Sequence, residues 1–159
     1  MNKIQNRESS KIVVFSLNEP RYALYLSAVE RVVRAVEITP LPKVPDIVLG
    51  IINLNGEIMP VIDIRKLFRL PSSVINLEDQ FIITRTSKRH AVLVVDAVIG
   101  VYDIAHHQII DAEDAFPYTN YISGVTKIET NIILINDLEK FLSLDDEKKL
   151  SEALSKGVK

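Results

Sequence analysis

The sequence predicts an all-β protein made of two similar small β-barrels, for three reasons. The first is an internal repeat, because residues 50–68 return as residues 124–142 and residues 11–33 return as residues 80–102. The second is the spacing of short apolar segments, about five in each half, which is typical of small barrels. The third is the composition, since 47 % of the 159 residues are hydrophobic and 25 % are charged. A chain of this length and composition can bury one compact core.

The first half is expected to contain short strands separated by turns. They cover residues 12–17, 21–26, 32–38, 50–54 and 57–63. Residues 27–31 are expected to form one helical turn with Ser27 at its start. Asn55 and Gly56 separate two apolar runs, a strong hairpin signal because both central residues of a tight turn need positive φ. A short helix over residues 64–68 follows, and Asp63 is placed to accept its free N–H groups.

The second half repeats this order with a longer middle loop. Its expected strands cover residues 81–86, 91–95, 101–104, 122–128 and 131–136, with a turn at residues 96–99 and an irregular stretch at residues 105–120. Asp137 is expected to begin a helix over residues 137–142, as Asp63 does in the first half. Leu150 and Leu154 give residues 143–159 one apolar stripe, which indicates a C-terminal helix.

These elements divide the chain into three parts. Residues 1–10 are polar and are expected to form a disordered tail. Residues 11–142 are expected to form the repeated domain, with halves at about residues 11–70 and 79–142. Residues 143–159 form the expected C-terminal helix.

The composition excludes several classes of protein. No cysteine is present, which excludes disulfides, thiolate nucleophiles and cysteine-ligated metal centres. The N-terminus lacks the apolar core of a signal peptide, and the longest apolar stretch, residues 91–102, is interrupted by Asp96 and too short to span a bilayer. The net charge of −2 gives no general attraction to nucleic acid. A soluble cytoplasmic protein without direct membrane insertion is expected.

Asp63 and Asp137 are the candidates for catalysis, because they occupy the same place in each repeat. Acid–base catalysis needs two carboxylates that face one substrate, so an enzyme using the groove between the barrels is one alternative. The favoured interpretation is that each aspartate caps a short helix. Phosphate-loop, dinucleotide-binding and serine-nucleophile motifs are missing from the sequence.

Histidines and loop carboxylates are the candidates for metal binding. His106 and His107 are neighbours on an extended segment and would point to opposite sides, and His90 is the only other histidine. A zinc site needs three or four ligands, so exposed loop histidines are the favoured interpretation. The nearby carboxylates lack EF-hand spacing and its central glycine, and these are Asp111, Glu113 and Asp114. No metal or cofactor is expected.

A small-barrel nucleic-acid binder is a further alternative. It would need a basic groove, and the residues that could supply its charge are Arg31, Arg34, Lys43 and Arg65. The acidic balance of the chain argues against it.

The remaining candidates are apolar. Val29, Val32 and Val33 are more apolar than a helical turn and a strand between charged neighbours require. They either fill the core or form a protein-binding patch near the seam between the two halves. The residues alone leave both alternatives open.

One segment and two shorter runs resemble a known family. The segment VLGIINLNGEIMPVID at residues 48–63 resembles the signature of CheW-like chemotaxis coupling proteins. The runs at residues 15–33 and 95–101 are also similar to that family, so the resemblance covers roughly residues 11–142. The hairpin segment is fairly specific to the family, whereas the rest is generic strand.

Membership would imply two intertwined five-stranded SH3-like barrels and a non-enzymatic adaptor in chemotaxis signal transduction. Such adaptors bridge the regulatory domain of a CheA-type histidine kinase and the cytoplasmic tip of methyl-accepting receptors, and are recruited to membrane receptor arrays. The positions that would contact receptor or kinase are Val29, Val32, Asn55, Val98 and Val101. The positions that would hold the scaffold are Gly50, Asn53, Gly56, Pro60, Asp63, Gly124 and Asp137.

The hairpin turn departs from the family, which usually has Asn-Leu-Arg-Gly where this chain has Asn-Leu-Asn-Gly at residues 53–56. Asn adopts positive φ more readily than Arg does, which favours the hairpin. The chain loses a long cationic side chain that could make charge-assisted hydrogen bonds. A divergent scaffold for a signalling array outside chemotaxis is therefore the alternative to the coupling adaptor.

Overall fold

The described chain folds mainly into β-strands, with only short helical turns between them. The computed structural model describes residues 9–18, 21–111 and 122–140. The first half forms β1 (Ser9–Ser16), β2 (Arg21–Tyr25), η1 (Leu26–Ala28), β3 (Val29–Arg34), β4 (Val48–Leu54), β5 (Glu57–Ile62) and α2 (Ile64–Leu67). The second half forms β6 (Gln80–Arg85), β7 (His90–Val95), β8 (Ala97–Ala105), η2 (His106–Gln108), β9 (Ile110–Asp111), β10 (Ile122–Ile128), β11 (Asn131–Asn136) and η3 (Leu138–Lys140). No helix within these ranges is long and apolar enough to cross a membrane.

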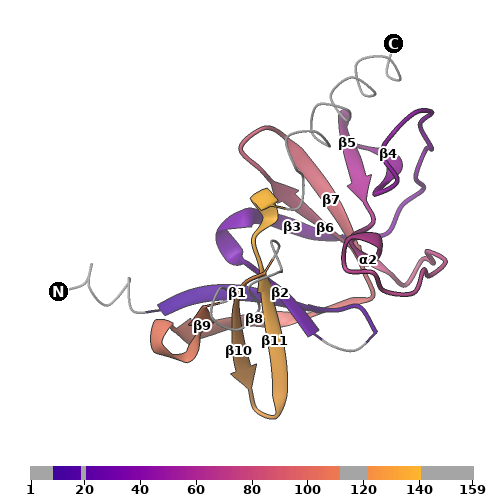
Figure 1. Cartoon of the computed structure of the whole chain (residues 1–159). Helices are drawn as coiled ribbons and strands as arrows, with labels where there is room; N and C mark the ends of the chain where they lie inside the picture. The colour runs from indigo at the N-terminus through magenta and orange to yellow at the C-terminus, as the bar shows by residue number, and fades with distance from the viewer. Residues whose placement is uncertain (1–8, 19–20, 112–121, 141–159) are drawn as a thin grey trace.

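The strands form two sheets, and each sheet takes strands from both halves of the chain. Barrel 1 has the order β8-β1-β2-β11-β10-β9, and barrel 2 has the order β3-β6-β7-β5-β4. Parallel pairing joins β11 to β2 in barrel 1 and β5 to β7 in barrel 2. Figure 1 shows the chain passing from barrel 1 to barrel 2 through η1 and returning between β7 and β8. The two barrels are therefore intertwined, as the resemblance implied.

Each barrel is closed by a short segment, the one that follows β3 in barrel 2 and the one that follows β8 in barrel 1, and this closure explains a glycine in each repeat. In barrel 2, Thr39 and Ile51 exchange backbone hydrogen bonds of 2.8 and 2.9 Å. In barrel 1, β9 pairs with β10 in the same way. A Cβ at Gly50 would lie 2.3 Å from the carbonyl oxygen of Thr39, and one at Gly124 would lie 2.7 Å from Cγ2 of Ile109. The closing segment thus passes too near for a side chain.

The repeat extends to the β-bulges. One extra residue interrupts the ladder at Glu30 in β3 and at Ile99 in β8. A second pair interrupts the hairpins at Leu49 in β4 and at Ser123 in β10. Bulges bend a strand and redirect its side chains, so both copies of the repeat use the same backbone devices to curve the sheet.

The main apolar cluster lies at the seam and takes residues from both barrels. Its buried members are Phe15, Leu17, Tyr22, Leu24, Val48, Ile62, Ile64, Ile82, Ala91, Leu93, Val95 and Leu138. Tyr22 of β2 stacks on Phe68, which follows α2, with ring centroids 4.8 Å apart. A smaller cluster around Phe81 fills barrel 2, and one around Ile12 fills barrel 1. Because the seam cluster is shared, each barrel completes the core of the other.

Several expected local features are confirmed. Asn55 and Gly56 have φ values of 53° and 88°, as the tight hairpin turn requires. Asp63 caps α2, because its carboxylate accepts the N–H of Arg65 at 3.1 Å. Asp137 accepts the N–H of Glu139 at 3.0 Å. The element after Asp137 is the 3₁₀ turn η3, and residues 141–142 of the expected helix lie outside the described residues.

Other expectations need correction. Ser27 caps nothing, because η1 begins one residue earlier and has no side-chain cap. β3 starts at Val29 because it pairs with β6 from that residue, and it ends at Arg34. The turn expected at residues 96–99 is absent, because β8 pairs with β1 from Ala97 onward and absorbs the irregularity as a bulge. Strand β1 begins at Ser9, inside the expected tail, and residues 1–8 and the expected C-terminal helix are not among the described residues.

Candidate partner-binding surface

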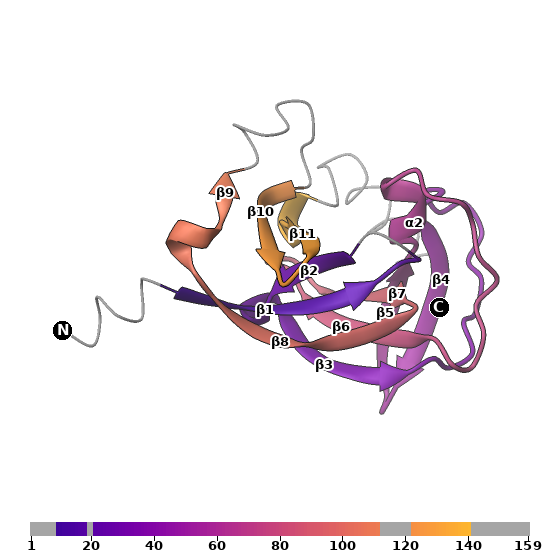
Figure 2. The ribbon, with the colours of Figure 1, turned by 90° about the horizontal axis from the view of Figure 1, so that it is seen from below.

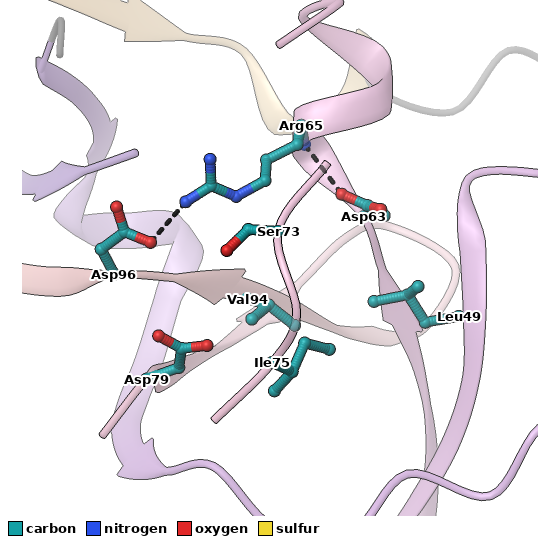
Figure 3. Close-up of a pocket in the computed structure, with 8 residues that line it drawn as sticks. All are labelled: Leu49, Asp63, Arg65, Ser73, Ile75, Asp79, Val94 and Asp96. Carbon is teal, nitrogen blue, oxygen red and sulfur yellow. Dashed lines mark hydrogen bonds and ion pairs between the residues drawn. The ribbon is translucent and has the colours of Figure 1, made fainter. Parts of the chain in front are cut away.

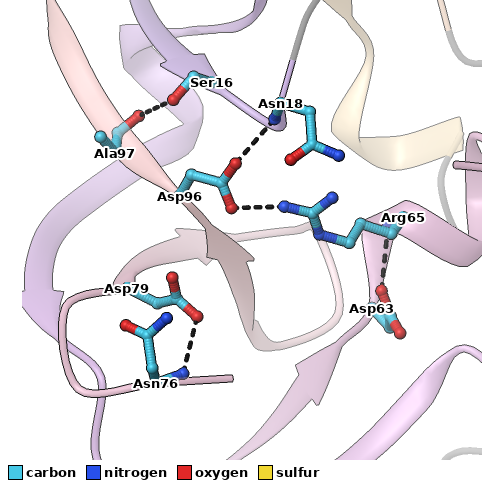
Figure 4. A network of polar contacts seen from close by, with 8 residues as sticks. All are labelled: Ser16, Asn18, Asp63, Arg65, Asn76, Asp79, Asp96 and Ala97. Carbon is cyan, nitrogen blue, oxygen red and sulfur yellow. Dashed lines mark hydrogen bonds and ion pairs between the residues drawn. The ribbon is translucent and has the colours of Figure 1, made fainter. Parts of the chain in front are cut away.

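A polar network fixes the point where the chain returns from barrel 2 to barrel 1. Asp96 is the single residue between β7 and β8. Its carboxylate accepts hydrogen bonds from Nη2 of Arg65 and, at 2.7 Å, from the N–H of Asn18 (Figure 4). Its own N–H donates to the carbonyl of Ser16 at 3.0 Å. One carboxylate therefore joins α2 of barrel 2 to the β1–β2 turn of barrel 1.

A small cavity lies beside this network. Its volume is about 30 Å³, and it is lined by Leu49, Asp63, Arg65, Ser73, Ile75, Asp79, Val94 and Asp96 (Figure 3). The side chain of Arg65 is 9 % exposed, and its Nη1 has no hydrogen-bond partner among the described residues. A space of this size accommodates one or two water molecules and no organic substrate. Burial raises the pKa of the nearby Tyr22 hydroxyl, and the charge of Arg65 opposes that rise.

A larger opening lies near η1 and η3, and only one of the two candidate catalytic carboxylates lines it. Its volume is about 210 Å³, and it is lined by Tyr25, Ser27, Ala28, Arg85, Ser123, Asn136, Asp137, Leu138 and Glu139. Asp137 lines this opening, whereas Asp63 lines the small cavity. Each of the two already accepts a backbone N–H at the start of a helical turn. They do not face one substrate, so the arrangement that acid–base catalysis would need is not present.

The valines singled out from the sequence lie mostly at the seam. Val29 and Val32 on β3 and Val98 on β8 are half-buried and pack against the shared cluster. The N–H of Val98 donates to the side chain of Gln80 on β6 at 2.7 Å, which ties β8 to barrel 2. Val101 is 56 % exposed. These valines are thus partly core and partly surface.

Asn55 lies apart from the valines, at the tip of the β4–β5 hairpin. Figure 1 shows this hairpin extending away from the sheet of barrel 1. Asn55 is exposed, and the side chain of Asn53 accepts the N–H of Gly56 at 2.9 Å, which stabilises the turn.

Pro60 is buried in β5 just before pairing with β7 begins, so its missing N–H removes no bond of that ladder. Seen from below, β4 and α2 lie toward one end of the molecule and β9 toward the other, with β10 and β11 between them (Figure 2).

A cluster of charged residues on barrel 2 was not singled out from the sequence. Nε2 of His90 lies 2.8 Å from a carboxylate oxygen of Glu30, at ion-pair distance but not aligned for a hydrogen bond, and Nδ1 contacts the carboxylate of Glu57. Arg85 approaches the other oxygen of Glu30 at 3.8 Å. The contact with His90 lowers the pKa of the Glu30 carboxyl, against its partial desolvation and with help from Arg85 and Arg31. Glu30, Glu57 and His90 are far apart in sequence, so no local pattern joins them. The sequence marked His90 only as a possible metal ligand.

The other charged candidates do not assemble into a site. Nε2 of His106 lies 2.9 Å from the hydroxyl of Ser10, and both His106 and His107 are exposed. Across the described part of the chain, no three metal-binding side chains converge, and Glu113 and Asp114 lie outside it. Arg65, counted toward a basic groove, is instead buried and paired with Asp96.

Comparison with known proteins agrees with this architecture. The CheW-like domain model matches residues 11–146. The chemotaxis protein CheW of Treponema pallidum is 26 % identical over 152 residues, which cover 92 % of this chain and 89 % of that protein. The chemotaxis protein CheW of Thermotoga maritima is 26 % identical over 132 residues, covering 83 % of this chain and 87 % of that protein.

A solved structure matches in fold as well as in sequence. The scaffolding protein TtCheW from Thermoanaerobacter tengcongensis superposes with a TM-score of 0.78 and 35 % identity, covering 86 % of this chain and 94 % of that one. Two intertwined barrels with a shared seam, a family match over most of the length and this structural likeness lead to one conclusion: the chain belongs to the CheW-like domain family.

Proposed function

We propose that this protein is a non-enzymatic adaptor that couples a CheA-type histidine kinase to methyl-accepting chemotaxis receptors. The observation that supports this most is the two-barrel architecture, which it shares with the scaffolding protein TtCheW at 35 % identity over 86 % of the chain. The separation of Asp63 and Asp137 into different cavities argues against an enzyme that uses these two carboxylates between the barrels.

The receptor-facing surface is proposed to include Val29, Val32, Val98 and Val101. The first three lie against the shared core and keep part of their surface exposed, and Val101 is largely exposed. Half-buried valines supported by a rigid core suit the apolar face of a helix, because they lose little freedom on binding. A receptor tip made of helices would supply such a face.

The kinase-facing surface is proposed to include the β4–β5 hairpin with Asn55. This hairpin is at the opposite end of barrel 2 from the seam, so kinase and receptor would not compete for one site. Binding to both would place the protein on the cytoplasmic side of a receptor array without inserting it into the membrane.

Isothermal titration calorimetry with two partners tests this function: the regulatory domain of a CheA-type kinase from the same genome, and a helical receptor-tip fragment. Val101→Asp is expected to weaken receptor-tip binding about tenfold or more, because it places a charge in the apolar contact. Val101 is exposed, so this change should leave the fold intact. Val32→Asp should also destabilise the protein, since Val32 packs on the seam cluster.

Val36→Asp is the matched control. Val36 is 40 % exposed and does not belong to the seam cluster, so binding should persist. If the unmodified protein binds neither partner, the adaptor function is wrong.

The hairpin turn favours a second candidate, a scaffold for a divergent signalling array. Asn55 stands where the family usually has arginine, and it is exposed at the tip. If Asn55→Arg creates binding to a chemotaxis kinase that the natural protein does not bind, the divergent role is supported.

A further inference from the structure

Three strands of barrel 2 bring charged side chains to one histidine. His90 begins β7, Glu57 begins β5, and Glu30 is the bulged residue of β3. The bulge matters because an inserted residue redirects the side chain relative to a regular strand. Other charged groups lie near this contact: Arg31 of β3 and Arg85 of β6 act on the Glu30 carboxyl, Arg85 is the strand partner of His90, and Arg89 precedes His90 in the chain.

Both ring nitrogens of His90 face carboxylates. Nδ1 contacts Glu57, and Nε2 lies 2.8 Å from Glu30. A neutral imidazole has one N–H and one lone pair, so it would turn a lone pair toward one of the two carboxylates. The protonated ring has an N–H on Nδ1, which contacts Glu57, and a positive charge at ion-pair distance from Glu30. The arrangement therefore fits the protonated ring.

The ring of His90 is also poorly placed to form hydrogen bonds with water in place of its contacts with the carboxylates. The side chain of His90 is 17 % exposed, whereas those of Glu30 and Glu57 are about half exposed at 44 % and 51 %. When the ring loses its proton, the carboxylates can turn to solvent but the histidine cannot. One contact is then replaced by repulsion between a lone pair and a carboxylate.

We propose that protonated His90 is a positioning residue that links β3 to the β4–β5 hairpin through its contacts with Glu30 and Glu57, here called the clasp. Loss of the proton breaks one of these contacts and opens the clasp. Strand β3 holds Val29 and Val32, and the hairpin holds Asn55. Opening leaves one of the two carboxylates without its cationic partner, on the surface beside the hairpin. Because the ring has lost its positive charge, the net charge of this surface falls by one unit. The consequence for partner binding rests on the proposed function, whereas the clasp itself does not.

Unfolding by urea across a range of pH tests the clasp. Because the clasp requires the proton, its contribution is present at low pH and is lost between mildly acidic and mildly alkaline pH as the ring loses that proton. The urea midpoint of the natural protein should fall over this range relative to that of His90→Gln, whose side chain does not titrate. His106→Gln is the control, because the ring of His106 contacts the hydroxyl of Ser10 and forms no ion pair with a carboxylate among the described residues, and it should keep the natural profile. Identical profiles for the natural protein and His90→Gln would overturn the proposal.

Nuclear magnetic resonance of the histidine rings gives a second measurement on the folded protein. Glu30→Gln and Glu57→Gln should each move the ring signals of His90 toward those of a neutral imidazole, because each removes a carboxylate that contacts the ring. The ring signals of His107 should not change. If the His90 signals of both variants equal those of the natural protein, the clasp is wrong.

Binding of the kinase regulatory domain separates the two proposals. Its affinity should change over the same pH range for the natural protein and not for His90→Gln. An affinity that changes equally in both proteins would overturn the link to binding. Absence of binding at every pH, with the stability profile retained, would reject the adaptor function and support the clasp alone.

Discussion

Barrel 1 and barrel 2 have β-bulges and closely packed glycines at equivalent positions, and they differ in the side chains at other equivalent positions. Each has bulged residues at the same positions of the repeat, among them Glu30 in β3 and Ile99 in β8. In barrel 2 the bulge directs a carboxylate to His90. The positions of barrel 1 that correspond to the clasp are Ile99, Arg21 and Asn131, which offer no such charge arrangement. Bulges and glycines thus specify the barrel, while substitutions at equivalent positions give its two copies different chemistry.

The glycines at the start of the two hairpins differ in how strictly they are required, and this gives the largest expected effect. At Gly50 the φ is 151° and an added Cβ would meet backbone, 2.3 Å from the Thr39 oxygen. At Gly124 the nearest atom is a side-chain methyl of Ile109, which can move. Gly50→Ala should therefore cost about 3 kcal/mol or more, from strain and overpacking together, and Gly124→Ala about 1–2 kcal/mol.

Urea unfolding of the two alanine variants measures this difference. Equal losses would mean that the closing segment of barrel 2 yields as easily as that of barrel 1. In that case the backbone contact at Thr39 does not decide the need for glycine.

The two crossings between the barrels differ in whether side chains hold the backbone in place. At one crossing Asp96 holds Arg65 and Asn18, and at the other η1 has no side-chain cap. Asp96→Ala would leave the buried guanidinium of Arg65 without its partner and should cost about 2–3 kcal/mol, less than a fully buried pair because Asp96 is partly exposed. Ser27→Ala, in η1, should change the unfolding free energy by less than about 0.5 kcal/mol. A comparable loss at Ser27, seen by thermal or urea unfolding, would contradict this assignment.

Local signals made much of this fold predictable. The Asn55–Gly56 turn and the Asp63 cap depend on neighbouring residues, and both were expected from the sequence. The exchange of strands between halves depends on pairing such as β1 with β8, some ninety residues apart, and only the family resemblance indicated it. The continuity of β8 through residues 97–100 was missed for the same reason.

The candidate site was predictable to a smaller extent. The pattern of apolar residues led to Val29, Val32 and Val33, because apolar residues between charged ones are visible in a single segment. Val98 and Val101 came only from the family resemblance. The contact between Glu30 and His90 was not visible, because it joins residues on strands that are not adjacent in sequence and depends on a bulge. Periodicity assigns a bulged side chain to the wrong face, since it assumes a regular strand.

The hairpin turns give the smallest expected effect and the most direct comparison of the two barrels. Both central residues of the barrel 2 turn, Asn55 and Gly56, suit positive φ, whereas barrel 1 places Glu129 at a φ of 55°. Glutamate pays a steric cost there that asparagine largely avoids. Glu129→Asn should therefore stabilise the protein by about 0.5 kcal/mol, and Asn55→Glu should destabilise it by a similar amount. Urea midpoints that move in the same direction for both variants would show that φ preference does not set the difference between the turns, and that contacts of Glu129 outweigh it.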